Sequence, residues 1–127
     1  MQLLLIVGLG GFIGAVARYL LGAWIQSGFF SFPAGTLAIN VSGSFFIGLI
    51  MYASEYLGVF SQETRVFLTI GVLGAFTTLS TFSYETFRLI EGKQFMLAGA
   101  NIFLTIFLSL LAVYCGRVAI AVLGGLK

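Results

Sequence analysis

Four long apolar segments follow one another along the chain, separated only by short polar or glycine-bearing turns. They cover residues 3–25, 33–57, 65–89 and 95–123. A membrane-spanning α-helix needs about 20 predominantly apolar residues, so each segment is long enough to cross a bilayer. We therefore expect an all-α integral membrane protein in which residues 1–127 form a single domain of four transmembrane helices.

The composition agrees with a lipid environment. Of the 127 residues, 60% are hydrophobic and 8% are charged, whereas about a quarter of the residues in a soluble domain are charged. The net charge is only +2 and the cations are scattered, which argues against a nucleic-acid partner. The single cysteine, Cys115, excludes an internal disulfide, and the absence of histidine removes the commonest general base and metal ligand.

The charges near the ends of the expected spans give no preferred orientation. With four spans, both termini lie on one side of the membrane, together with the turn between the second and third spans. That side holds Arg65, Arg117 and Lys127, and the other side holds Arg18, Arg88 and Lys93. Since cytoplasmic loops normally carry the excess of Lys and Arg, this equal tally selects neither orientation.

The equal tally has two interpretations. Either the protein simply has few charges, or copies insert both ways and pair as an antiparallel dual-topology homodimer. Four short helices enclose little interior, which favours the dimer.

Glycine spacing predicts close packing between helices. Gly10 and Gly14 are four residues apart, and Ala17 extends the series by almost another turn. Gly43 and Gly48 offer a second smooth patch. Small residues let helix backbones approach in lipid, so we interpret both patches as structural.

Polar side chains recur on one face of the second segment. Thr36, Asn40 and Ser44 are each four residues apart, about one helical turn. Ser and Thr hydroxyls can bond to carbonyls of their own helix, whereas the Asn40 amide has two donors and two acceptors to satisfy. The spacing leaves open whether Asn40 joins two helices or faces a water-filled lumen.

Two arginines lie within the expected spans. We expect Arg117 to extend its side chain to the lipid headgroups. Arg18 lies deeper in the chain's first span, where it either lines a water-filled vestibule or caps backbone carbonyls. Glu85 and Arg88 are three residues apart, and we expect them to neutralise one another.

The third segment contains the sequence GAFTTLSTFSYE, residues 74–85, in which half the residues carry a hydroxyl group. Gly71 and Gly74 precede two adjacent β-branched residues, Thr77 and Thr78, and this combination weakens a helix. We therefore expect the third span to be broken near its middle. Carbonyls freed by such a break can coordinate a cation where the backbone is buried in protein or faces water.

Around this break, hydroxyls and aromatic rings occupy neighbouring faces. One face carries Thr77, Thr81 and Glu85, and the next carries Phe76, Leu79 and Phe82. Hydroxyls donate hydrogen bonds to an anion, and the positive edge of a phenyl ring can also face one. The pattern predicts a site for a small dehydrated ion, and it leaves the identity of that ion open.

Three segments carry a resemblance to a known family. They are GGFIGAVARY (10–19), PAGTLAINVSGSF (33–45) and GVLGAFTTLSTFSYE (71–85). With these motifs the chain resembles the Fluc, or CrcB, family of fluoride channels over essentially its whole length. The resemblance implies a channel rather than an enzyme, which exports fluoride passively and confers resistance to its toxicity. It further implies an antiparallel homodimer with two fluoride pores, surrounded by lipid in the bacterial cell (inner) membrane as a multi-pass protein.

The resemblance also assigns roles to residues by motif position. One structural sodium ion at the dimer centre is expected to be held by the backbone carbonyls of Gly74 and Thr77. The vestibule arginine falls on Arg18. The residues expected to line the fluoride pore are Asn40, Thr36, Ser80, Thr81, Phe82, Leu79 and Ser109.

Two positions depart from the family pattern. The family string usually reads TTFSTF, with two pore phenylalanines per subunit, but here the first is Leu79 and only Phe82 keeps its ring. Leucine preserves bulk and loses the aromatic edge. A family threonine four residues beyond Ser109 falls on Val113. These departures predict either slower permeation or a pore in which one ring per subunit is enough.

Two other functions remain as alternatives. A small dual-topology multidrug exporter needs a carboxylate near the middle of the membrane to exchange a proton for a cation. The first span contains no acidic residue, and the four glutamates are expected at or near segment ends, which argues against this function. A non-transporting membrane assembly protein would pack helices only, and it would tolerate replacement of Asn40 by leucine.

Overall fold

The computed structural model describes residues 1–125, so Lys127, which entered the charge tally, lies outside the described part. The helices follow the chain in the order α1 (Gln2–Gln26), α2 (Ala34–Leu57), α3 (Gln62–Val66), the π-helical segment η1 (Phe67–Leu73), α4 (Gly74–Phe76), α5 (Leu79–Glu91) and α6 (Phe95–Leu123).

Four helical stretches are long and apolar enough to cross a membrane. They are α1, α2, the composite stretch Gln62–Glu91 that runs from α3 to α5, and α6. Their ends differ from the predicted ends by three residues or fewer. The prediction of an all-α protein with four potential spans is therefore confirmed.

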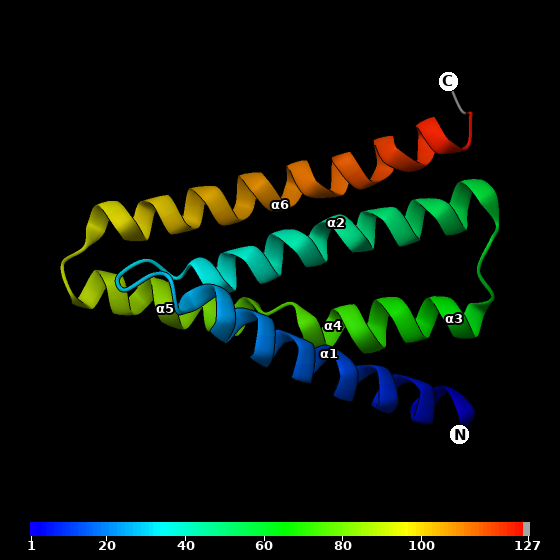
Figure 1. The fold of residues 1–127 in the computed structure, drawn as a ribbon, viewed down its shortest axis with the longest axis horizontal. Helices are drawn as coiled ribbons and strands as arrows, with labels where there is room; N and C mark the ends of the chain where they lie inside the picture. Colours follow the sequence, from blue (N-terminus) through cyan, green and yellow to red (C-terminus); the bar gives the residue numbers. More distant parts are fainter. Residues whose placement is uncertain (126–127) are drawn as a thin grey trace.

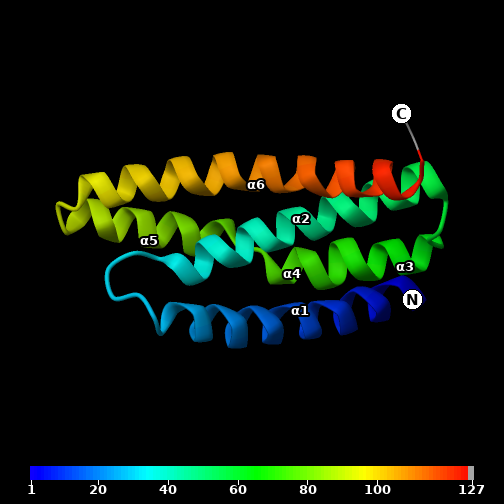
Figure 2. The same cartoon turned by 45° about the horizontal axis from the view of Figure 1, so that its top comes forward.

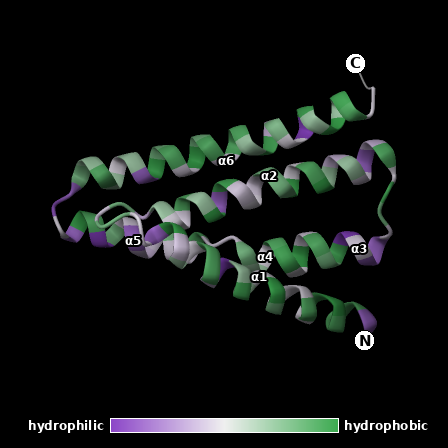
Figure 3. Ribbon diagram, viewed as in Figure 1, coloured by the Kyte–Doolittle hydropathy of each residue, from purple (hydrophilic) through white to green (hydrophobic). Residues whose placement is uncertain are grey.

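The helices run side by side, with α2 between α6 and α1 in both views of the bundle (Figures 1 and 2). The N-terminus, the end of α6 and the turn from α2 to α3 lie at one end of the bundle (Figure 1). The turns from α1 to α2 and from α5 to α6 lie at the other end. Hydrophobic residues cover most of each span, and hydrophilic residues gather in α3, in α5 and at the turns (Figure 3).

The buried apolar core is small. Ile39 of α2, Leu73 of η1 and Phe76 of α4 form its one cluster within residues 1–125. Most other large apolar side chains are exposed, as is expected where the surrounding solvent is hydrocarbon. Packing between these helices therefore depends on close backbone contact and on polar bonds.

Glycines allow helix backbones to approach closely. A Cβ atom on Gly10 would lie 2.9 Å from the Phe67 carbonyl oxygen, and one on Gly14 would overlap the Val72 carbonyl oxygen. The predicted packing role of Gly10 and Gly14 is thus confirmed, with η1 as their partner.

The second predicted patch is not a single surface. A Cβ on Gly43 would collide with Thr77 of the third span, whereas one on Gly48 would lie 2.6 Å from the Val113 carbonyl oxygen of α6. The two glycines are five residues apart, which on a helix directs them to different neighbours. Gly116 of α6 completes the second contact, since its Cβ would lie 2.6 Å from the Phe45 carbonyl oxygen.

The third span is interrupted where the sequence predicts it. After α4, Thr77 and Thr78 adopt extended backbone angles, with ψ of 156° and 111°, and α5 then begins at Leu79. Thr78 is the N-cap of α5, because its hydroxyl accepts a hydrogen bond from the Thr81 N–H at 3.2 Å. Before α4, the seven residues of η1 form a π-helix, a rare geometry that often accompanies functional sites.

Candidate ion pathway

The amide of Asn40 holds the interruption of the third span. Its nitrogen donates to the Thr78 carbonyl at 3.1 Å, and its oxygen accepts from the Thr78 N–H at 2.8 Å. Asn40 is 9% exposed, so these bonds replace water for a backbone that no longer pairs within a helix. Asn40 therefore joins two spans, which is one of the two roles that the spacing left open.

The interruption leaves the carbonyls of residues 74–77 without the donors that residues 78–81 would supply in a continuous helix. In a continuous helix the Thr78 N–H would bond to Gly74 and the Thr81 N–H to Thr77. Here the Thr78 N–H bonds to the Asn40 side chain instead, and the Thr81 N–H bonds to the Thr78 hydroxyl. The carbonyls that lose these donors are those of Gly74 and Thr77, the pair expected to hold a cation.

Arg18 bonds to a third carbonyl beside the interruption. Its Nε donates to the carbonyl oxygen of Ala75 at 3.1 Å, across a separation of 57 residues in the chain. The prediction offered a vestibule or carbonyl capping for Arg18. In the structure Arg18 caps the Ala75 carbonyl, and its side chain also lines a cavity.

Glu85 does not pair with Arg88, and that prediction was wrong. Thr36 of α2 donates its hydroxyl hydrogen to Glu85 Oε1 at 2.9 Å, while Arg88 pairs with Glu91 at 3.2 Å. Arg88 and Glu91 are exposed near the end of α5, whereas Glu85 is half-buried and lies against α2. The other carboxylate oxygen of Glu85 is buried and has no hydrogen-bond partner within residues 1–125.

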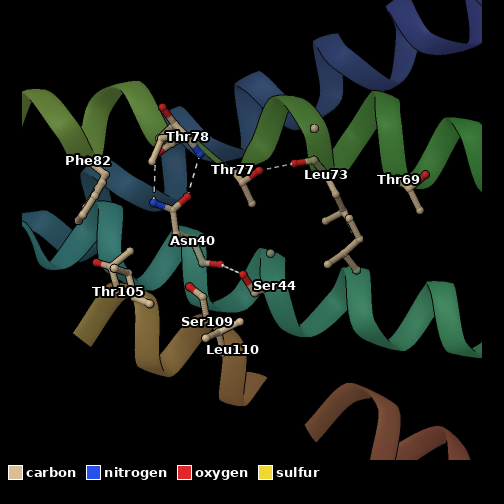
Figure 4. A pocket seen from close by; sticks show the side chains of 15 residues that line it. Asn40, Ser44, Thr69, Leu73, Thr77, Thr78, Phe82, Thr105, Ser109 and Leu110 are labelled. Atoms are coloured by element: carbon tan, nitrogen blue, oxygen red, sulfur yellow. Dashed lines mark hydrogen bonds between the residues drawn. The ribbon is translucent and has the colours of Figure 1, made fainter. Parts of the chain in front are cut away.

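A cavity of about 490 Å³ opens between α2, the interrupted span and α6. Figure 4 shows Asn40, Thr78, Phe82, Thr105 and Ser109 around it, contributed by all three spans. Its remaining lining residues are Gly43, Ser44, Ile47, Thr69, Leu73, Gly74, Thr77, Leu79, Ile106 and Leu110. The lining is mostly apolar, with hydroxyl and amide groups placed at intervals and no charged side chain.

A second cavity, of about 330 Å³, lies on the other side of the interruption. Arg18, Thr36, Thr81 and Glu85 line it, and Thr78 lines both cavities. Thr36 and Asn40 lie one turn apart on α2 and belong to different cavities. Thr78, at the interruption, therefore borders both cavities.

The residues expected at the site are therefore divided between the two cavities. Asn40, Leu79, Phe82, Ser109, Gly74 and Thr77 line the first, and Arg18, Thr36 and Thr81 line the second. Ser80 lines neither; its exposed hydroxyl lies 3.2 Å from that of Thr78. Val113, the other departure from the family pattern, lies beside Gly48 at the α2–α6 contact.

Thr105 is a site residue that the sequence reasoning missed. Its hydroxyl lines the first cavity, is buried, and has no hydrogen-bond partner among the described residues. Asn101, Thr105 and Ser109 recur every four residues on the last span, the same signal that drew attention to Thr36 and Asn40. Applied to the fourth span, that signal would have found Thr105 and Asn101.

The fold and the two cavities define a class: a small membrane protein of four spans whose interrupted third helix borders two cavities that contain hydrogen-bonding groups. Comparison with known proteins makes the class specific. A model of the family described as "CrcB-like protein, Camphor Resistance (CrcB)" matches residues 5–117.

Named relatives cover nearly the whole chain. "Fluoride-specific ion channel FluC 3" of Methanosarcina barkeri is 58% identical, with all of both chains covered. "Fluoride-specific ion channel FluC 1" of Methanosarcina acetivorans is also 58% identical, over 94% of this chain and 91% of its own. "Fluoride-specific ion channel FluC" of Geobacter sulfurreducens is 48% identical, over 94% of this chain and 97% of its own.

The chain belongs to the CrcB family. Its relatives are named as ion channels and not as enzymes, and with four apolar spans it is a multi-pass membrane protein. The resemblance stated from the sequence is confirmed.

Proposed function

We propose that this protein is a fluoride-selective channel that lets fluoride leave the cell passively and so protects it from fluoride toxicity. The observation that carries the proposal is the first cavity, in which the hydroxyl and amide groups of Asn40, Thr105 and Ser109 stand in an apolar lining beside the Phe82 ring. A small anion that sheds water in the membrane needs hydrogen-bond donors in place of its hydration shell. The names of the relatives supply the identity of the anion.

The unpartnered hydroxyl of Thr105 supports this function. A buried hydroxyl without a partner costs stability, roughly 1 to 3 kcal/mol, so its presence in a cavity calls for a ligand or a water. A hydroxyl can donate its hydrogen to an anion without placing a fixed charge in the cavity.

We propose further that two copies pair as an antiparallel homodimer with two pores. Leu79 lines the first cavity and is 75% exposed, so the cavity is open at the side where Leu79 lies. A second copy would close that side and shield the ion from lipid. The equal charge tally at the two ends is compatible with insertion in both directions.

We also propose a structural sodium ion held by the carbonyls of Gly74 and Thr77. Both carbonyls have lost the N–H groups that a continuous helix would supply, because those groups bond to Asn40 and to the Thr78 hydroxyl. Carbonyl oxygens are suitable ligands for a hard cation. A sodium ion would supply positive charge that fixes the interrupted backbone. The cell membrane, in bacteria the inner membrane, is the compartment in which such a channel acts.

The test is anion flux from liposomes that contain the purified protein. We expect fluoride to leave rapidly and chloride to leave at the rate of protein-free vesicles. Equal flux of both anions, or none of either, contradicts the proposal. Proton-coupled uptake of a cationic dye in the same vesicles would support the multidrug exporter instead, with Glu85 in the second cavity as its carboxylate.

A further inference from the structure

Asn101 of α6 is the most deeply buried polar side chain in the described part of the chain, at 1% exposed. Its amide nitrogen donates to the hydroxyl of Thr86 on α5 at 2.9 Å. The Thr86 hydroxyl in turn donates to the carbonyl oxygen of Phe82, one turn earlier, at 2.7 Å. A continuous chain of hydrogen bonds therefore runs from α6 to the backbone of Phe82.

α5 has few other means of keeping its place. Its only buried residues are Thr86 and Leu89, and it follows the extended residues Thr77 and Thr78, which do not transmit the rigidity of a helix. In lipid the hydrophobic effect does not press helices together, so polar bonds and close packing decide their positions. On the side of α2, Thr36 bonds to Glu85 of α5, and Asn40 bonds to Thr78, the N-cap of α5. On the side of α6 the bond to Asn101 has this role.

The bond lies directly beside the first cavity. Phe82 lies four residues before Thr86 on α5, about one turn away on the same helix face. Thr105 lies four residues after Asn101 on α6, again about one turn away on the same face. Phe82 and Thr105 both line the cavity. The pair Thr86–Asn101 therefore stands one turn from the pair Phe82–Thr105, and a shift at the first pair moves the second.

We propose that Asn101 is a positioning residue for anion selection: through Thr86 it fixes the spacing between the Phe82 ring and the Thr105 hydroxyl. The proposal rests on fluoride conduction as the function of the first cavity. Fluoride is smaller than chloride, so a cavity held at a fixed width by a buried amide favours it. A wider or more variable cavity admits chloride or leaves fluoride with poorer contacts.

The experiment compares fluoride and chloride flux in liposomes for the wild type and four variants. Thr86→Val exchanges the hydroxyl for a methyl group, and Asn101→Leu removes the amide at similar volume. Thr86→Ser keeps the hydroxyl and is the rescue variant. Ser83→Ala is the matched control, because Ser83 also bonds to the carbonyl four residues earlier on α5, at 2.9 Å, and is exposed.

We expect Thr86→Val and Asn101→Leu to lower the fluoride-to-chloride flux ratio roughly tenfold, as the loss of about one hydrogen bond's free energy would do. Thr86→Ser and Ser83→Ala should keep the wild-type ratio. Each variant is first checked for an unchanged gel-filtration profile in detergent. If Asn101→Leu does not fold, Thr86→Val, the smaller change, decides.

Two results overturn the proposal. One is a folded Thr86→Val with the wild-type ratio, and the other is a fall in both fluxes by the same factor, which is what a purely structural bond would give. Absence of fluoride flux in the wild type is a different result, since it contradicts the proposed function itself.

Discussion

Gly43 and Thr77 are in direct contact, with the Thr77 methyl group occupying the space that a Cβ on residue 43 would need. Gly43 lies on α2 one turn from Asn40, so the same helix supplies both the polar clamp on Thr78 and the space for Thr77. The two extended residues of the third span are thus fitted to α2 by shape as well as by hydrogen bonds. Gly43 thus leaves room for the Thr77 methyl group beside the interruption.

Gly43→Ala is expected to displace Thr77 and destabilise the protein by about 2 kcal/mol, as overpacking of a filled site does. Fluoride flux should fall with it, because the displaced residues border the first cavity. Thermal unfolding in detergent and liposome flux measure the two effects. Gly99→Ala is the control, since nothing lies within 4 Å of a Cβ there. An equal response of both variants would contradict the contact argument.

Asn40→Leu is expected to abolish fluoride flux. Leucine fills the volume but leaves the Thr78 N–H without its partner, at a cost of about 2 kcal/mol. Ser42→Ala on the same helix should change neither property, because Ser42 bonds only to carbonyls of α2. Wild-type flux in Asn40→Leu would favour a protein that only packs helices, as an assembly factor does.

Thr105→Val is expected to lower fluoride flux without lowering the stability of the protein. Because the Thr105 hydroxyl is buried without a partner among the described residues, its removal should leave the unfolding temperature unchanged or raise it. Fluoride flux should nevertheless fall, since the cavity loses a hydrogen-bond donor. A less stable variant with normal flux would show that this hydroxyl has a structural partner in the assembled protein.

Sodium dependence is the test of the proposed cation site. Replacing sodium by a large organic cation during purification and assay should lower fluoride flux or weaken the dimer, while Thr77→Ala should retain activity because it keeps the carbonyl. Flux measured in both media, with chemical cross-linking to score the dimer, gives the answer. Identical behaviour with and without sodium would rule out the site.

Leu79→Phe is expected to conduct fluoride at least as fast as the wild type. Leu79 lines the first cavity, and a phenylalanine there adds a positive ring edge toward an anion. Initial rates of fluoride efflux from matched liposomes compare the two. A clear loss of flux would mean that the leucine is part of a differently packed pore.

Much of the fold follows from the sequence alone, because long apolar runs have one stable arrangement in lipid: a helix that satisfies its own backbone. The same reasoning placed the interruption in the third span, since adjacent β-branched residues after glycines weaken a helix locally. The stripe of Thr36 and Asn40 was likewise visible as a polar face with a four-residue repeat.

Tertiary structure decided which groups bond to one another. From the sequence we expected Glu85 to pair with Arg88, because the two are near in the chain. In the structure Glu85 instead bonds to Thr36, 49 residues away. Gly43 and Gly48 looked like one patch and face two different spans. The bond of Asn101 to Thr86, and the place of Thr105 in the first cavity, depend on the packing of α6 against α5 and α2. Local spacing fixes which face of a helix is polar, whereas the partner of that face depends on the packing of all four spans.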